Sequence, residues 1–265
     1  MTWIEAVILG VVQGLTEFLP VSSSGHLEIG TVLLGIKTNE NLLFAVIVHA
    51  ATALSTIVVY REDLREIVMG LFDFKYNESL SFSLKIVLSM IPVGIVGVFF
   101  ERDIEAFFGG KLVLVGSMLL VTSALLFFTH FAKENAGKVT YGKALIIGLA
   151  QAIAILPGIS RSGSTIATAL FLGVEKSKAT RFSFLMVLIP ILGASFLKFI
   201  DYIESPQTHE GLSAFPLILG FLAAFISGYF ACKWMIGIVR KGKLTWFAVY
   251  CFVIGSIALI SQIWI

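Results

Sequence analysis

The amino-acid sequence predicts an all-α polytopic membrane protein, with six transmembrane helices and two re-entrant helical hairpins arranged as an inverted-topology repeat. Hydrophobic residues make up 57% of the 265 residues, charged residues make up only 14%, and the mean hydropathy is +0.95. A soluble domain carries about 25% charged residues, so this chain has too few polar side chains to cover a soluble core. The net charge of +2 gives no strong positive field, so we expect no nucleic-acid partner.

The first predicted element is residues 5–35, an apolar stretch long enough for two short helices. Leu19 and Pro20 lie near its middle, and three serines and a glycine follow closely. Proline removes a backbone donor and breaks the helical ladder. Freed backbone groups are tolerated at membrane depth only inside protein or beside a water-filled cavity. We therefore predict a re-entrant hairpin, with an ordinary kinked span as the alternative.

Three apolar runs follow this hairpin, and three more follow a second interrupted stretch at 144–174. Each run is close to the length of about 20 residues that a helix needs to cross the hydrocarbon. The stretch 144–174 contains Leu156 and Pro157 near its middle, so we predict a second re-entrant hairpin there. The six predicted transmembrane helices are 42–60, 82–100, 112–130, 182–199, 215–235 and 245–264.

The two hairpins share a residue pattern. In each hairpin a glutamine, Gln13 or Gln151, precedes a Ser-Gly pair by the same spacing. We therefore treat 1–265 as a single membrane domain made of two pseudo-repeats, 1–133 and 134–265, each with one hairpin and three spans. An odd number of crossings in each half inverts the second copy. Inverted repeats place broken helices face to face near the midplane, where binding sites form.

The loop charges predict the orientation, because Lys and Arg concentrate in cytoplasmic loops. Basic residues gather in four predicted loops, while the remaining loop 200–214 has no Lys or Arg. The two basic loops that flank the second hairpin lie on the same side only if that hairpin returns to the side it entered from. The first hairpin then opens outward and the second opens inward. The four basic loops are 61–81, 131–143, 174–181 and 236–244.

The first hairpin carries most of the reactive side chains. Gln13 and Glu17 are four residues apart, so they share one face of a helix. Serines at the start of the next helix can cap its free amides, and the same helix start attracts anions. Polar groups at membrane depth are costly and usually functional. The run that starts the second short helix is Ser22, Ser23, Ser24, Gly25 and His26.

The second hairpin supplies a cation surrounded by hydroxyls and glycine. The guanidinium of Arg161 can bind phosphate oxygens in a bidentate way, and glycine lets backbone amides approach an anion closely. Pairing of Arg161 with Glu17 is the structural alternative, and it is compatible with phosphate binding. Together the two hairpins offer a carboxylate, a serine, a histidine and a cation, which suits phosphoryl transfer or hydrolysis. The neighbours of Arg161 are Ser160, Ser162, Gly163, Ser164 and Thr165.

The segments GLTEFLPVSSSGH and LPGISRSGST closely resemble the two signature regions of the bacitracin-resistance family of undecaprenyl-diphosphate phosphatases. The resemblance covers essentially the whole chain. It implies an enzyme of the cell (inner) membrane that hydrolyses undecaprenyl diphosphate to the monophosphate and inorganic phosphate. This reaction recycles the lipid carrier for cell-wall synthesis and gives tolerance to bacitracin. The resemblance also implies a polyprenyl diphosphate lipid as substrate and a divalent cation, Mg²⁺ or Ca²⁺.

The residues of the two hairpins and the resemblance together give a mechanistic hypothesis. Ser23 is expected to attack the terminal phosphorus, His26 to transfer a proton, and Arg161 to hold the diphosphate. Glu17, with Gln13, is expected to hold the divalent ion or to accept a proton. Many family members have two carboxylates where this chain has Gln13 and Glu17, which weakens a metal model that requires both. The expected substrate-binding residues are Gln13, Ser22, Ser24, Gly25, Ser160, Ser162, Gly163 and Thr165.

Several alternatives stay open at this point. Water could attack the phosphorus directly, without a phosphoserine. Opposed broken helices also describe secondary transporters, so the chain could instead move a lipid phosphate or a small anion across the membrane. His49 could face the site from behind Glu17 or be a hydrogen-bonded structural residue. Because the first hairpin enters from outside, we expect the site to open to the outer face. The sequence leaves open whether the chain forms a homodimer.

Overall fold

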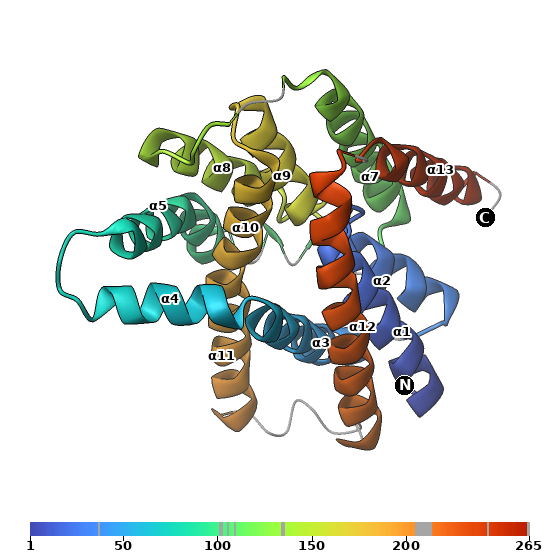
Figure 1. The fold of residues 1–265 in the computed structure, drawn as a ribbon. Helices are drawn as coiled ribbons and strands as arrows, with labels where there is room; N and C mark the ends of the chain where they lie inside the picture. The colour runs from blue at the N-terminus through green and yellow to red at the C-terminus, as the bar shows by residue number, and fades with distance from the viewer. Residues whose placement is uncertain are drawn as a thin grey trace.

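The computed structural model describes residues 1–36, 38–100, 103–104, 106–108, 110–133, 136–204, 214–242 and 244–263. Throughout these ranges the regular structure is helical, apart from one isolated bridge between Gly137 and Val174, which confirms the all-α class (Figure 1). The helices are α1 (Trp3–Phe18), α2 (Ser23–Leu33), α3 (Thr38–Val59), α4 (Arg61–Leu71), α5 (Glu78–Phe99), α7 (Leu112–Phe128), the 3-10 turn η1 (Thr129–Phe131), α8 (Tyr141–Ile153), α9 (Arg161–Phe171), α10 (Lys176–Met186), α11 (Leu188–Glu204), α12 (Ala214–Arg240) and α13 (Thr245–Ser261).

Both predicted hairpins are pairs of short helices. Helix α1 begins with a capping box between Thr2 and Glu5 and ends immediately before Leu19 and Pro20. Helices α1, α2, α8 and α9 have 16, 11, 13 and 11 residues. At 1.5 Å per residue the longest of them measures about 24 Å, which is shorter than the hydrocarbon core of about 30 Å. The predicted breaks in both stretches are therefore confirmed.

Four helical segments are long and apolar enough to cross a membrane: Glu78–Phe99, Leu112–Phe131, Lys176–Leu197 and Ala214–Val239. They correspond to four of the six predicted spans. The predicted span 42–60 falls on α3, which passes the same test only when it is taken together with α4. The predicted span 245–264 falls on α13, which is apolar but has only 17 residues. The described residues therefore form a multi-pass membrane protein.

The predicted loop 61–81 is wrong in its first half, because residues 61–71 form α4. Charged residues in the first half of 61–71 suggested a loop, but the apolar residues of this segment recur at helical spacing and give an amphipathic helix. Helix α4 is bent by 76° from the last part of α3. The apolar residues of α4 are Leu64, Ile67, Val68, Met69 and Leu71. Most of the predicted acidic loop 200–214 lies outside the described residues.

Helix packing pairs the two halves of the chain. Helix α1 packs along α12 and α8 packs along α5, while α7 packs against α13 (Figure 1). Glycines bring the first two pairs together. A Cβ added to Gly10 of α1 would lie 2.4 Å from the carbonyl oxygen of Gly220. A Cβ added to Gly148 of α8 would lie 2.3 Å from the carbonyl oxygen of Ser89. Each hairpin therefore rests on a span from the opposite half.

The largest buried apolar cluster surrounds the second hairpin and contains Phe18, Ile166, Phe182, Phe184 and Met186. Buried polar residues gather beside it, where the breaks of the two hairpins meet. They come from α1, α2, α3, α9 and α10, so five helices enclose one polar region in an otherwise apolar protein. Its members include Gln13, Ser22, Ser23, Thr52, Ser160, Ser162, Thr165 and Ser183.

Candidate active site

The two hairpin breaks contact each other directly through Ser22. This residue has a positive φ of 69°, a conformation that costs energy in a residue with a Cβ, and it caps α2. Its Oγ accepts hydrogen bonds from the backbone N–H of Gly25 (3.2 Å) and from that of Gly158 in the second break (3.1 Å). A Cβ on Gly25 would lie 3.0 Å from the Cα of Gly158, so the loops meet through glycine. The cap therefore joins the two hairpins.

The second break is held in the same way. Ser160 caps α9 by accepting a hydrogen bond from the N–H of Gly163 at 3.0 Å. Thr122 of α7 donates to the carbonyl oxygen of Gly158 (2.8 Å) and accepts from the N–H of Ser160 (3.1 Å). Ser160 and Gly163, expected to bind substrate, thus support the helix start. The contribution of Thr122 was not predicted, because a single threonine in an apolar span carries no motif.

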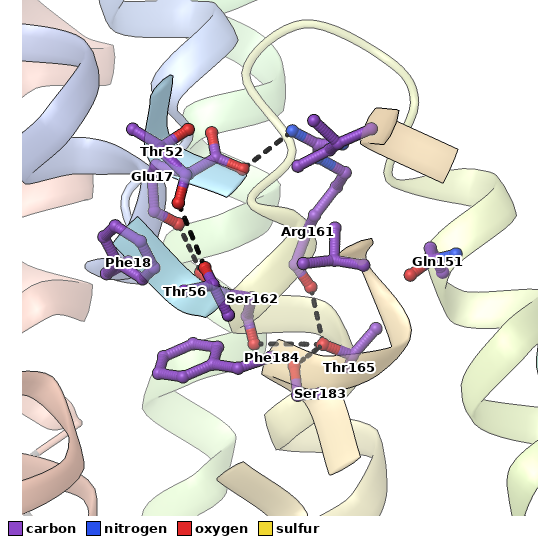
Figure 2. A pocket seen from close by; sticks show the side chains of 12 residues that line it. Glu17, Phe18, Thr52, Thr56, Gln151, Arg161, Ser162, Thr165, Ser183 and Phe184 are labelled. Carbon is purple, nitrogen blue, oxygen red and sulfur yellow. Dashed lines mark hydrogen bonds and ion pairs between the residues drawn. The ribbon is translucent and has the colours of Figure 1, made fainter. Parts of the chain in front are cut away.

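Glu17 lies at the centre of the site, and its side chain is 8% exposed. Arg161 Nη2 donates to Glu17 Oε1 at 2.9 Å, so the two hairpins are joined by an ion pair (Figure 2). The other carboxylate oxygen, Oε2, accepts from Ser23 Oγ at 2.5 Å and from Gln13 Nε2 at 2.9 Å. His49 Nδ1 lies 3.2 Å from the same oxygen. Four side chains therefore fix one buried carboxylate.

His49 faces the site, which resolves the two alternatives that the sequence left open. Its Nδ1 lies 2.8 Å from Gln13 Nε2, so it contacts both members of the Gln13–Glu17 pair. Thr52 and Thr56 follow His49 on the same face of α3 and line the pocket beside Glu17. Helix α3 therefore forms the wall of the site opposite the second hairpin. The spacing of these three residues, i, i+3 and i+7, is the signal that could have placed all of them in the site.

His26 has different partners from those expected. Its Nδ1 lies 2.8 Å from the carbonyl oxygen of Ser22, and its Nε2 lies 2.8 Å from the hydroxyl of Tyr250 in α13. The His26 ring stacks on the Tyr250 ring with centroids 5.6 Å apart. A carbonyl only accepts, so Nδ1 carries a proton and the neutral ring accepts from Tyr250. Both ring nitrogens are thereby bonded to groups other than Ser23. No motif in the sequence indicated that Tyr250 contacts His26.

Below the ion pair the hydroxyls of the second hairpin bond mainly to protein. Thr165 Oγ1 donates to the carbonyl oxygen of Arg161 at 2.8 Å and contacts the hydroxyl of Ser183 in α10 (Figure 2). Ser162 Oγ lies 3.4 Å from the carbonyl oxygen of Leu19. In the first hairpin, Ser24 Oγ lies 3.4 Å from the hydroxyl of Ser22. Of these residues expected to contact substrate, Ser162 connects the two hairpins and Thr165 connects to α10, whereas Ser24 bonds within its own hairpin.

A small pocket lies beside the ion pair, with a cavity volume of about 20 Å³ (Figure 2). This volume holds about one water molecule, so the diphosphate cannot enter the pocket without rearrangement. Gln151 lines the pocket, and its buried Oε1 has no hydrogen-bond partner among the described residues. The Oε1 of Gln13 is also buried without a hydrogen-bond partner among the described residues. The equivalent glutamines of the two hairpins therefore each retain one unused acceptor.

The donor set fits a divalent cation only in part. The described residues contain no group of three or more His, Cys, Asp or Glu side chains that could hold a metal ion. Glu17 is the one carboxylate of the cluster, and the orphaned Oε1 of Gln13 is a second oxygen donor. Mg²⁺ is commonly held by one or two carboxylates together with substrate phosphates and water. Such a shared site suits these residues, whereas an all-protein cage does not.

The fold and the site together define a class: a multi-pass helical membrane protein with a buried carboxylate, serine and arginine where two broken helices meet. The family model described as bacitracin resistance protein BacA matches residues 6–257, and the chain belongs to this family. Proteins named undecaprenyl-diphosphatase are similar over nearly their whole length. The one from Bacteroides thetaiotaomicron is 53% identical over 99% of this chain and 100% of its own. The one from Christiangramia forsetii is 53% identical over 97% of each chain.

Proposed function

We propose that this protein hydrolyses undecaprenyl diphosphate to undecaprenyl phosphate and inorganic phosphate, recycling the lipid carrier for cell-wall synthesis and giving resistance to bacitracin. The observation that carries the proposal is the contact of Ser23 Oγ with Glu17 Oε2 at 2.5 Å, with Arg161 on the other carboxylate oxygen. A nucleophile bonded to a base beside a cation is the arrangement that phosphoryl transfer requires. Family membership and the names of the relatives support the substrate.

Arg161 is the proposed binding group for the terminal phosphate. Its contact with Glu17 uses Nη2, and a guanidinium has five N–H donors, so the remaining donors can bind phosphate oxygens. Arg161 is also the first residue of α9, and Ser23 is the first residue of α2. The positive ends of two helix dipoles therefore meet beside the guanidinium and add to its attraction for an anion.

Glu17 is the proposed base. It accepts the Ser23 proton as Ser23 Oγ bonds to the terminal phosphorus, and the bond from that phosphorus to the bridging oxygen breaks. Undecaprenyl phosphate leaves. Water then attacks the phosphoserine phosphorus, the bond from phosphorus to Ser23 Oγ breaks, Ser23 Oγ takes back the proton held by Glu17, and inorganic phosphate leaves. Gln13 and His49 hold Glu17 in position for this transfer. We assign the first proton transfer to Glu17 instead of His26, because both ring nitrogens of His26 are bonded to Ser22 and Tyr250.

A divalent cation, Mg²⁺ or Ca²⁺, is proposed to bind together with the substrate. Glu17 and the Oε1 of Gln13 would hold it along with phosphate oxygens. When bound, it would neutralise charge on the diphosphate. Because Glu17 already contacts four side chains, we expect the ion to bind weakly before the substrate arrives.

For the membrane arrangement we propose six transmembrane helices and two re-entrant hairpins, related as an inverted repeat. The short hairpin helices support this arrangement, as does the exchange of partners, in which α1 packs on α12 and α8 on α5. The loop charges support a site open to the outer face of the cell membrane. Cysteines introduced at Lys75 and Thr208 and labelled with an impermeant reagent test the orientation. In intact cells we expect the reagent to label position 208 and not position 75. Labelling of position 75 alone would overturn the proposed orientation.

Transport of a lipid phosphate or a small anion is the second candidate, favoured by the two opposed broken helices. The Ser23–Glu17 contact favours hydrolysis, since transport needs no nucleophile. The deciding experiment measures phosphate released from undecaprenyl diphosphate by the purified protein in detergent with Mg²⁺ or Ca²⁺. Phosphate release that follows protein concentration is expected. If a folded preparation releases no phosphate, the hydrolase proposal is wrong and transport becomes the favoured function.

A further inference from the structure

A second, larger cavity lies away from the site described above. It has a volume of about 570 Å³ and shares no lining residue with the pocket beside Glu17. Its walls come from α4, the start of α5, α10 and the segment before α8; in Figure 1, α4 and α5 lie to the left of α10. Four cations, Lys85, Lys138, Lys178 and Arg181, line it together with the carboxylates Glu66 and Glu78. The volume is in the range of sites that bind small molecules.

One of these cations has no carboxylate partner among the described residues. The Lys85 ammonium lies 5.3 Å from the centre of the Tyr141 ring. Arg181 is instead paired, because its Nε lies 2.5 Å from Asp63 Oδ1 and its Nη2 lies 3.9 Å from Glu66 Oε2. Lys85 is especially informative, because a lysine inside an apolar spanning helix is costly without an anion nearby.

The remaining cations are held only by exposed carboxylates. Lys138 Nζ lies 3.6 Å from Glu78 Oε1, and the two side chains are 75% and 97% exposed. Lys178 Nζ lies 2.5 Å from Glu175 Oε2, and these two side chains are 41% and 40% exposed. Ion pairs of this kind contribute little to stability, so an incoming anion can replace the carboxylates at little cost.

The surroundings of the cavity place it at the membrane boundary. The amphipathic helix α4, which supplies Ile67 to the cavity, carries exposed Val68 and Met69, and exposed Phe72 and Phe74 follow it. Its bend of 76° from α3 is what a helix lying in the membrane interface requires. Tyr76 lines the cavity and its hydroxyl bonds to that of Tyr141 at 3.1 Å, and tyrosine is enriched at headgroup depth.

We propose that this cavity binds the phosphate headgroup of an anionic phospholipid from the leaflet next to α4. Lys85 supplies an ammonium that has no carboxylate partner among the described residues, and Lys138 and Lys178 exchange their exposed carboxylates for the phosphate. Basic pockets between transmembrane helices bind anionic headgroups in this way. The acyl chains then lie along the apolar surface of α4 and α5, which is why a membrane lipid fits better than free phosphate.

Native mass spectrometry of the purified protein with phosphatidylglycerol or phosphatidylcholine tests the proposal. The variant Lys85→Gln/Lys138→Gln is compared with Lys133→Gln/Lys241→Gln, which removes the same charge from residues that do not line the cavity. Loss of the two cavity lysines is expected to weaken phosphatidylglycerol binding about thirtyfold. The control variant and phosphatidylcholine binding are expected to stay unchanged. A second cavity variant, Lys138→Gln/Lys178→Gln, changes only exposed side chains and is used if the first does not fold.

Three results would overturn the proposal. Undiminished phosphatidylglycerol binding by both cavity variants means that the cavity is not the site. An equal loss in the control variant means that general surface charge attracts the lipid. Displacement of the lipid by inorganic phosphate at equal concentration means that the cavity selects free phosphate.

Discussion

Replacing Arg161 by glutamine separates the structural role of the ion pair from its role in binding phosphate. The Glu17 carboxylate is 8% exposed and the Arg161 side chain is 27% exposed, so the pair is largely buried. Removing one partner of a buried pair costs about 3–5 kcal/mol. Glu17 keeps its contacts with Gln13, Ser23 and His49, and Arg161 is partly solvated. We therefore expect Arg161→Gln to destabilise the fold by about 2–3 kcal/mol, below that range.

The double variant Glu17→Gln/Arg161→Gln gives the matched comparison. It removes both buried charges, and neutral replacement of a buried pair is often close to neutral for stability. We expect it to regain most of the stability that Arg161→Gln loses. Hydrolysis should not return, because both the base and the phosphate-binding cation are absent. Loss of the cation alone is expected to lower kcat/KM by about 100- to 1000-fold, as loss of one transition-state donor does in other enzymes.

The assay combines thermal unfolding in detergent with initial rates of phosphate release, for the wild type, both single variants and the double variant. Arg161→Lys is a further control, since it keeps the charge but loses the planar fork, and we expect an activity between those of wild type and Arg161→Gln. Wild-type stability in Arg161→Gln, or no recovery of stability in the double variant, would refute the inference that the pair stabilises the meeting of the hairpins.

Three further predictions concern packing, the site and the metal. Gly148→Ala should lower the unfolding free energy by about 1–3 kcal/mol, because the added Cβ would lie 2.3 Å from the Ser89 carbonyl oxygen. Gly94→Ala is the control, since its Cβ would meet no atom within 4 Å, and equal melting temperatures of the two variants would contradict the prediction. His49→Ala should slow hydrolysis about tenfold, because the Glu17 carboxylate loses one of the contacts that position it. His130→Ala, which changes an exposed histidine, is the control, and equal rates in the two variants would argue against a positioning role for His49. Exhaustive chelation should abolish hydrolysis and added Mg²⁺ or Ca²⁺ restore it; full activity after chelation removes the metal from the account.

The sequence was informative where polar residues interrupt apolar ones. Glu17 and Arg161 could be assigned to one site because charged residues at membrane depth require partners. The breaks at Pro20 and Pro157 were equally predictable, because glycines and serines follow each proline closely; proline alone does not suffice, since Pro92 lies inside α5. His49 was partly predictable, because its position in a spanning helix raised the question of a partner without answering it.

Other features depend on three-dimensional neighbours that no local pattern records. Tyr250 contacts His26 across more than two hundred residues, and Thr122 fastens the second hairpin from a different span. Each is a single polar residue in an apolar helix, so neither differs from an ordinary packing residue in the sequence. Helix α4 was missed for the opposite reason. The charges in its N-terminal half suggested a loop, although Leu64, Ile67 and Val68 have helical spacing.

The central claim is that Ser23, activated by Glu17, attacks the terminal phosphorus. The most direct measurement is the rate of phosphate release by Ser23→Ala, compared with Ser123→Ala, which changes a buried serine of α7 whose hydroxyl donates to the carbonyl oxygen of Ala248. The account predicts that Ser23→Ala folds normally and loses at least about 1000-fold in kcat, while Ser123→Ala keeps its activity. Turnover by a folded Ser23→Ala at the rate of Ser123→Ala would contradict the account.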